Sequence, residues 1–132
     1  MMTLNISAPN WKPSLRIKRP SVYISAKDSF IAKNILEQLD YDFYATNHDE
    51  LDLTDTNAVD RYFADKFFDF VIHTACVGGR RNEPDTIETF DTNYNMFENL
   101  LNNQEHYKYL INIGSGSDRL ETWYGKAKRV IA

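Results

Sequence analysis

A serine, a tyrosine and a lysine near the C-terminal end of the sequence have a spacing that suits acid–base chemistry. Ser115 follows a predicted strand, and Tyr124 precedes Lys128 by four residues. On a helix, residues four apart share a face, with Cβ atoms about 5 to 6 Å apart. An ammonium at that distance stabilises a phenolate and lowers the tyrosine pKa from about 10. The trio therefore suits proton transfer at a hydroxyl, although the tyrosine–lysine spacing alone also occurs on ordinary surface helices.

Four segments resemble the extended branch of the short-chain dehydrogenase/reductase family, and they occur along the chain in the same order as in that family. This branch contains nucleoside-diphosphate-sugar epimerases, dehydratases and GDP-fucose synthase-like reductases. Residues 69–81, DFVIHTACVGGRR, are similar to its strand and loop DVVIHxAxxGG. Residues 48–55 resemble its adenine-side loop, residues 90–101 its asparagine-bearing helix, and residues 123–132 the start of its catalytic helix. The resemblance extends over about residues 21 to 132 and implies a Rossmann-like α/β fold.

The resemblance also implies a site that uses NAD or NADP, with the nicotinamide carrying the hydride. Ser115 would bond the reacting hydroxyl, Tyr124 would exchange the proton, and Lys128 would tune Tyr124 while binding the nicotinamide ribose. The implied cofactor-binding positions are Ala26, Ser29, Phe30, Ile31, Asp52, Leu53, Ala75, Asn93 and Lys128. For Asn93 a second interpretation is equally open, in which its side-chain amide is buried and hydrogen-bonds the backbone instead of binding a cofactor.

The loop that follows residue 77 supplies the implied substrate positions, Gly79, Arg80 and Arg81. The two guanidinium groups suit a sugar-nucleotide diphosphate, although exposed loop arginines are often only solvated. His48 occupies the place where some relatives carry an arginine for the NADP 2′-phosphate. The sequence therefore gives little support for NADP.

The first turn of the family is altered in this chain. The family pattern GxxGxxG is replaced by residues 26–32, AKDSFIA. The glycines permit a tight turn, close approach of the backbone to a pyrophosphate, and close helix packing. We expect weak cofactor binding, because Ser29 adds a side chain and Asp28 adds a negative charge near the phosphates. Either of these two residues can instead cap the following helix. Glycine at positions 26, 29 and 32 with a neutral residue at 28 should then raise the affinity for NAD.

Composition and charge exclude several classes of function. The chain has 132 residues, of which 42% are hydrophobic, and a net charge of −4. This is enough for one core and argues against a nucleic-acid partner. No apolar run is long enough for a membrane span, and the three histidines show no metal spacing. Cys76, the single cysteine, is expected to be a core residue at a strand end and makes a reducing cytoplasm the default compartment.

The hydrophobic periodicity alternates between strand and helix along the chain. It predicts strands at Val22–Ser25, Asp42–Thr46, Phe68–Thr74 and Tyr109–Gly114. Between them it predicts a helix after residue 29, a helix capped by Asp55 or Thr56 with Val59, Tyr62, Phe63 and Phe67 on one stripe, and a helix from Pro84–Asp85 with Phe90, Tyr94, Phe97 and Leu101 in register. Such alternation is typical of a parallel sheet with helices on both faces. His73, inside an apolar strand, is expected to be a hydrogen-bonded core residue.

These observations divide the chain into a basic N-terminal extension, residues 1–20, and a Rossmann-like domain, residues 21–132, without a C-terminal substrate lobe. Two functions remain open. One is an NAD(P)-dependent nucleotide-sugar epimerase, dehydratase or reductase-like domain, shortened and weakly active or inactive alone. The other is a non-catalytic module that binds a nucleotide or a protein. We also expect a homodimer, because apolar residues remain on helices that pair in this family: Met96, Phe97, Trp123, Val130 and Ile131.

Overall fold

The chain folds as a four-stranded parallel sheet with helices on both faces. In this computed structural model, residues 19–77, 86–113, 126–127 and 130 are described. The elements in chain order are β1 (Ser21–Ile24), α1 (Phe30–Gln38), β2 (Asp42–Ala45), α2 (Thr56–Phe63), β3 (Phe68–His73), α3 (Ile87–Leu101), the 3-10 helix η2 (Gln104–His106) and β4 (Tyr107–Asn112). The strand order is β2-β1-β3-β4, with every pair parallel. The predicted Rossmann-like α/β fold is confirmed, and strand boundaries shift by one or two residues.

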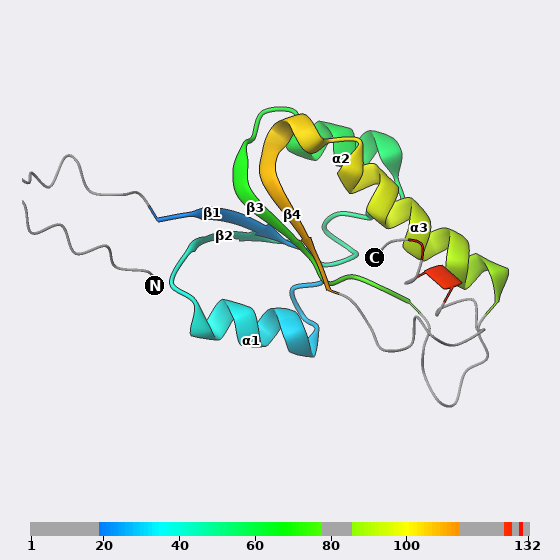
Figure 1. The fold of residues 1–132 in the computed structure, drawn as a ribbon, viewed down its shortest axis with the longest axis horizontal. Coiled ribbons are helices and arrows are strands. Elements are labelled where there is room, and N and C mark those ends of the chain that lie inside the picture. The colour runs from blue at the N-terminus through cyan, green and yellow to red at the C-terminus, as the bar shows by residue number, and fades with distance from the viewer. Residues whose placement is uncertain (1–18, 78–85, 114–125, 128–129, 131–132) are drawn as a thin grey trace, which may run out of the picture.

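Two hydrophobic layers hold this sheet between its helices. Helix α1 covers one face, and α2 and α3 cover the other (Figure 1). On β1, Tyr23 belongs to the cluster under α2 and α3, whereas Val22 and Ile24 belong to the cluster under α1. All three side chains have no exposed surface. A central parallel strand is buried on both faces, so its sequence is continuously apolar.

The helices begin at residues whose side chains satisfy free backbone amides. The Ser29 hydroxyl accepts a hydrogen bond from the Ala32 amide at 3.3 Å, and the Asp55 carboxylate accepts one from the Ala58 amide at 3.2 Å. Such caps each stabilise a helix by about 1 kcal/mol. Helix α2 ends at Phe63, so the predicted continuation of its apolar stripe to Phe67 is wrong. Phe67 lies beyond the helix and is exposed.

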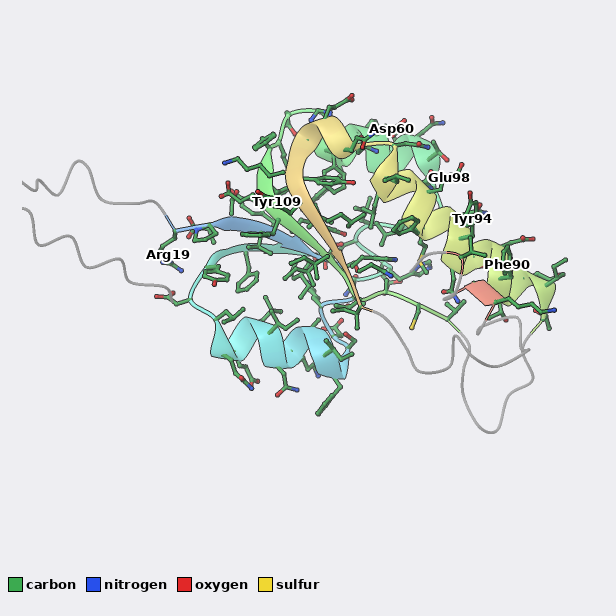
Figure 2. All side chains as sticks on the ribbon, in the orientation of Figure 1. Arg19, Asp60, Phe90, Tyr94, Glu98 and Tyr109 are labelled. Carbon is green, nitrogen blue, oxygen red and sulfur yellow. The ribbon has the colours of Figure 1, made fainter. Side chains whose placement is uncertain are left out.

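Helix α3 turns a different face to the sheet from the one predicted. The expected stripe contained Phe90, Tyr94, Phe97 and Leu101, but the buried residues are Asn93, Met96, Asn99 and Leu100. Phe90 and Tyr94 instead stack at 6.1 Å on the outer side of the helix (Figure 2). Asn93 and Asn99 lie on the inner face because their side-chain amides hydrogen-bond backbone groups, which an aromatic ring cannot do.

No helix among the described residues is long and apolar enough to cross a lipid bilayer. The basic extension lies outside the described residues apart from its last two positions. There Arg19 contacts Asp40 at 2.6 Å and Asp42 at 3.6 Å.

Candidate functional site

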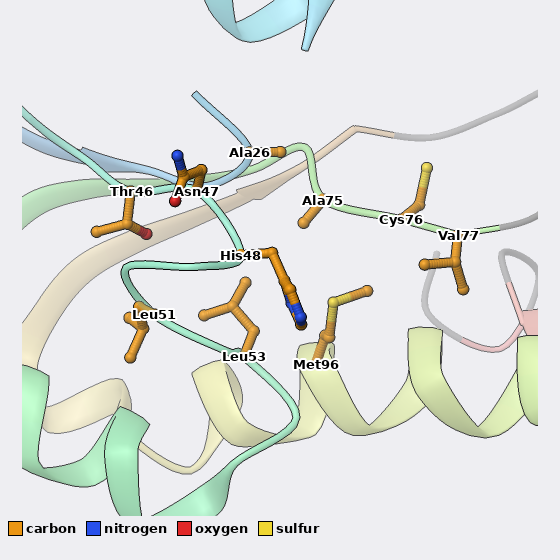
Figure 3. A pocket seen from close by; sticks show the side chains of 10 residues that line it. All are labelled: Ala26, Thr46, Asn47, His48, Leu51, Leu53, Ala75, Cys76, Val77 and Met96. Atoms are coloured by element: carbon orange, nitrogen blue, oxygen red, sulfur yellow. The ribbon is translucent and has the colours of Figure 1, made fainter. Parts of the chain in front are cut away.

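A cavity of about 190 Å³ lies at the carboxyl ends of the strands (Figure 3). Its walls come from three loops and from α3, and the lining residues are Ala26, Thr46, Asn47, His48, Leu51, Leu53, Ala75, Cys76, Val77 and Met96. Strands β1 and β3 are neighbours whose following helices lie on opposite faces of the sheet. This is a topological switch point, where open α/β sheets bind their ligands. The cavity is smaller than the roughly 300 Å³ lower limit for pockets that enclose a whole ligand, so it suits one part of a larger ligand.

The turn after β1 keeps a glycine-like backbone although its glycines are gone. Ala26 has φ of 51°, in the left-handed region that favours glycine. The Ser29 amide donates to the Ala26 carbonyl at 2.9 Å, which closes the turn. Among the described residues, no hydrogen bond uses the amides of Phe30 and Ile31, at the N-terminus of α1. A helix N-terminus with free amides favours an anion, so the turn retains part of the machinery for a phosphate.

Ser25 ties the end of β1 to the end of β3. Its hydroxyl oxygen accepts hydrogen bonds from the amides of Thr74 at 2.9 Å and Ala75 at 3.0 Å. The hydroxyl hydrogen is therefore left for His73 Nδ1, which lies 3.1 Å away. His73 is buried, so its interpretation as a hydrogen-bonded core residue is confirmed. This arrangement fixes Ala75 at the wall of the cavity.

Two buried amides on α3 fix the other loops. Asn93 Nδ2 donates to the Val77 carbonyl at 2.9 Å, and its Oδ1 accepts from the Val77 amide at 2.8 Å. Asn99 Nδ2 donates to the Leu53 carbonyl at 2.8 Å. Asn93 thus has the backbone-bonding role that was one of its two interpretations. One helix face sets the position of two cavity walls.

The apolar end of the cavity is closed by a short acid-bearing loop. Leu51 and Leu53 are buried, and the largely exposed side chain of His48 lies between Leu53 and Met96 in Figure 3. Asp52 accepts hydrogen bonds from Thr54 Oγ1 at 2.7 Å and from the Thr54 amide at 3.0 Å. These bonds hold the pKa of Asp52 below its ordinary value. The loop therefore presents an ionised carboxylate near an apolar floor that suits a planar base.

Two side-chain bridges join the β1–α1 turn to the β2–α2 loop. Lys27 Nζ lies 2.5 Å from Glu50 Oε1, and Asn47 Nδ2 donates to Asp28 Oδ2 at 3.2 Å. The bond to Glu50 raises the pKa of Lys27, and the bond to Lys27 lowers the pKa of Glu50. The Lys27 amide also donates to the Thr46 carbonyl at 3.1 Å. The two loops therefore form a single rim.

The structure brings together some of the cofactor-binding positions inferred from the sequence. Ala26, Leu53 and Ala75 line the cavity. Ser29 and Asn93 do not line the cavity, although Asn93 bonds the lining residue Val77. Phe30 and Ile31 are exposed at the start of α1. Asp52 belongs to the loop without lining the cavity. Ser115, Tyr124, Lys128, Gly79, Arg80 and Arg81 lie outside the described residues.

The sequence did not identify several residues of the cavity. Met96 and Val77 line it, and Met96 lies three positions after Asn93, a spacing that places both on one helix face. The expectation that Cys76 is a core residue is wrong, because the residue is exposed at the cavity wall. In Figure 3 its sulfur points away from His48 and Met96. Strand β3 ends at His73, so Cys76 lies in the loop and leaves the sheet layer.

Within the described part of the chain, no group of three or more histidine, cysteine or acidic side chains is arranged to hold a metal ion. A search of curated proteins found no match. A family model described as the NAD dependent epimerase/dehydratase family matches residues 22–131.

Solved structures with a similar fold include three that differ in substrate. GDP-mannoheptose C4 reductase from Campylobacter jejuni, with NADP bound, is 19% identical to this chain, with a TM-score of 0.72. The match covers 88% of this chain and 43% of the reductase chain. dTDP-4-dehydrorhamnose reductase from Bacillus anthracis, in complex with NADP, is 20% identical, with coverages of 88% and 49% and a TM-score of 0.71. UDP-glucose 4-epimerase from Bifidobacterium longum, with NAD+ and UDP, is 19% identical, with coverages of 84% and 46% and a TM-score of 0.65. The chain thus spans less than half the length of each of these structures.

Proposed function

The chain belongs to the NAD dependent epimerase/dehydratase family, and we propose that it is the cofactor-binding part of a nucleotide-sugar epimerase, dehydratase or reductase. The observation that carries this proposal is the position of the cavity at the switch point between β1 and β3. The left-handed backbone of Ala26, which suits a dinucleotide-binding turn, supports it. The family's solved relatives with bound NAD or NADP support the same cofactor class.

The described residues fit the adenosine and diphosphate end of a dinucleotide. The apolar floor of Leu51, Leu53 and Met96 accommodates a base, and the free amides of Phe30 and Ile31 face the position of a diphosphate at the N-terminus of α1. The Ala26 methyl group and the Ser29 hydroxyl narrow this approach, so we expect weak binding. A bound nicotinamide supplies the hydride acceptor in this family.

The resemblance assigns Ser115, Tyr124 and Lys128 to the proton transfer that accompanies hydride movement. Tyr124 would take the proton of the hydroxyl that Ser115 holds, and the Lys128 ammonium would lower the pKa of Tyr124. We propose that this chain does not turn over a nucleotide sugar by itself. The positioning of substrate against cofactor supplies much of the rate, and the chain covers less than half of each of the matched relatives.

A ligand titration tests the cofactor assignment. NAD at 100 times its dissociation constant should stabilise the folded chain by about 2.7 kcal/mol. Ala75→Leu should abolish this shift because it fills the cavity, whereas Ala64→Leu, at an exposed position after α2, should leave it unchanged. Failure of NAD and NADP to shift the melting temperature would instead favour a non-catalytic module, a function that the Ser29 cap on α1 also fits.

Turnover is tested separately with NAD and a panel of nucleotide sugars. We expect no NADH formation from this chain. Reduction of NAD that Tyr124→Phe abolishes would contradict the proposal that the chain is catalytically silent alone.

We also propose that two copies associate through the outer side of α3 and that the protein works in the cytoplasm. Ile87, Phe90, Tyr94 and Leu101 follow one another at intervals of three, four and seven residues, which is the spacing of a helix–helix seam. Ile87 and Leu101 are exposed. Met96 cannot take part as expected from the sequence, because it is buried against the sheet. Val130, at the other expected contact, is exposed.

A further inference from the structure

The carboxylate of Asp28, in the turn after β1, is bonded to Asn47, a residue that lines the cavity. In Rossmann folds, an acid about 20 residues after the glycine turn bonds the ribose hydroxyls of NAD, and an arginine there accommodates the 2′-phosphate of NADP. Counted from Ala26, that position falls at Thr46 and Asn47, neither of which is acidic or basic.

Both side chains already bond other protein groups, and neither can offer the ribose a carboxylate. The Thr46 hydroxyl lies 2.7 Å from the Tyr23 hydroxyl, inside the core. Asn47 Oδ1 accepts from the Glu50 amide at 3.0 Å, and Asn47 Nδ2 donates to Asp28 Oδ2 at 3.2 Å. The amide of Asn47 therefore serves to hold a carboxylate that comes from the other loop.

Asp28 has a neutral hydrogen-bond partner, whereas its acidic neighbour Glu50 is paired with a cation. Glu50 Oε1 contacts the Lys27 ammonium and also accepts a hydrogen bond from the Asn47 amide. Asp28 is exposed, and within the described residues its carboxylate has only the Asn47 amide as a hydrogen-bond partner. One of its two oxygens thus remains free to accept hydrogen bonds from vicinal ribose hydroxyls.

We infer that Asp28 is the ribose-recognising acid of this site, supplied by the first turn in place of the end of β2, and that it makes the site select NAD over NADP. This inference rests on the proposed cofactor site. A 2′-phosphate beside Asp28 would meet like charge. Lys27, the one lysine or arginine of these two loops among the described residues, is already paired with Glu50. The inference also reverses one expectation from the sequence, in which Asp28 repels the pyrophosphate and its neutralisation raises NAD affinity.

The two interpretations of Asp28 predict opposite effects of Asp28→Asn. If Asp28 binds the ribose, the variant should bind NAD about tenfold more weakly, the usual effect of losing a hydrogen bond to a charged group, and should bind NADP more tightly. If Asp28 repels the pyrophosphate, NAD and NADP affinities should rise together. Isothermal titration of the full chain with NAD and with NADP separates these outcomes.

A double variant that exchanges the side chains of positions 28 and 47 tests whether NAD preference can be restored. Asp28→Asn combined with Asn47→Asp returns the acid to the end of β2 and keeps an amide beside it, so NAD preference should recover. The control is Asp49→Asn, which removes one unit of charge from an exposed position in the same loop and should change either affinity by less than about twofold. All of these positions are at least partly exposed, and equal melting temperatures would show that folding is unaffected.

Three results would overturn the inference. Equal affinity of the unmodified chain for NAD and NADP would do so while leaving the proposed function intact. A parallel gain for both cofactors in Asp28→Asn would do the same. Absence of binding by either cofactor to the folded, unmodified chain would remove the proposed function and this inference with it.

Discussion

Ala26→Gly should stabilise the protein, although it removes a side chain and adds flexibility. Ala26 has φ of 51°, and the left-handed region costs a residue with a Cβ atom about 1 to 2 kcal/mol. Glycine avoids this cost but has about 0.4 to 1 kcal/mol more conformational entropy to lose on folding. The balance is a gain of about 0.5 to 1 kcal/mol. For a domain of this size, that corresponds to a melting temperature about 2 to 4 °C higher.

The matched control is the third position of the same altered motif. Ala32 is fully buried in α1, where glycine loses a packed methyl group and helix propensity, so Ala32→Gly should destabilise by about 1 to 2 kcal/mol. Urea unfolding of both variants, analysed at constant slope, gives the two free energies directly. A loss of stability in Ala26→Gly similar to that in Ala32→Gly would refute the argument that the turn keeps a strained glycine-type backbone.

Three further predictions concern the loops and the outer face. Asn93→Ala should destabilise by about 2 to 3 kcal/mol, read from the urea midpoint, because both backbone groups of Val77 lose their buried partner. Glu50→Gln should lower the melting temperature near neutral pH but not in acid. Because the pKa of Glu50 is lowered in the folded protein, its carboxylate stabilises the fold above the ordinary glutamate pKa, and this stabilisation is lost as the pH falls through the lowered pKa. The melting temperatures of the variant and the unmodified protein should therefore converge in acid. Tyr94→Lys should shift sedimentation at micromolar concentration from dimer to monomer without changing the melting temperature of the monomer, and a monomeric unmodified chain would contradict the proposed α3 seam.

Local features of the chain were predictable because they depend on neighbours in sequence. The apolar run of Phe70, Val71 and Ile72 identifies a strand covered on both faces. Asp55 caps the helix that follows it in the chain. The side-chain period of each segment is set by its own backbone geometry. The alternation of periods therefore determined the parallel α/β fold, and the quoted motifs determined the family.

The three-dimensional arrangement decided which of several suitable side chains became part of the site. Helix α3 carries an aromatic stripe and a stripe with two asparagines, and either has the spacing of a buried helix face. The stripe with Asn93 and Asn99 faces inward because these amides hydrogen-bond the backbone carbonyl groups of the loops. Asp28 and Asn47 are 19 positions apart, and nothing in either segment alone indicates their bond. Such a pair forms only when the sheet places β1 beside β2. The sequence by itself thus determined the fold and the family, and the packing of separate loops against one another decided which residues form the cavity and its rim.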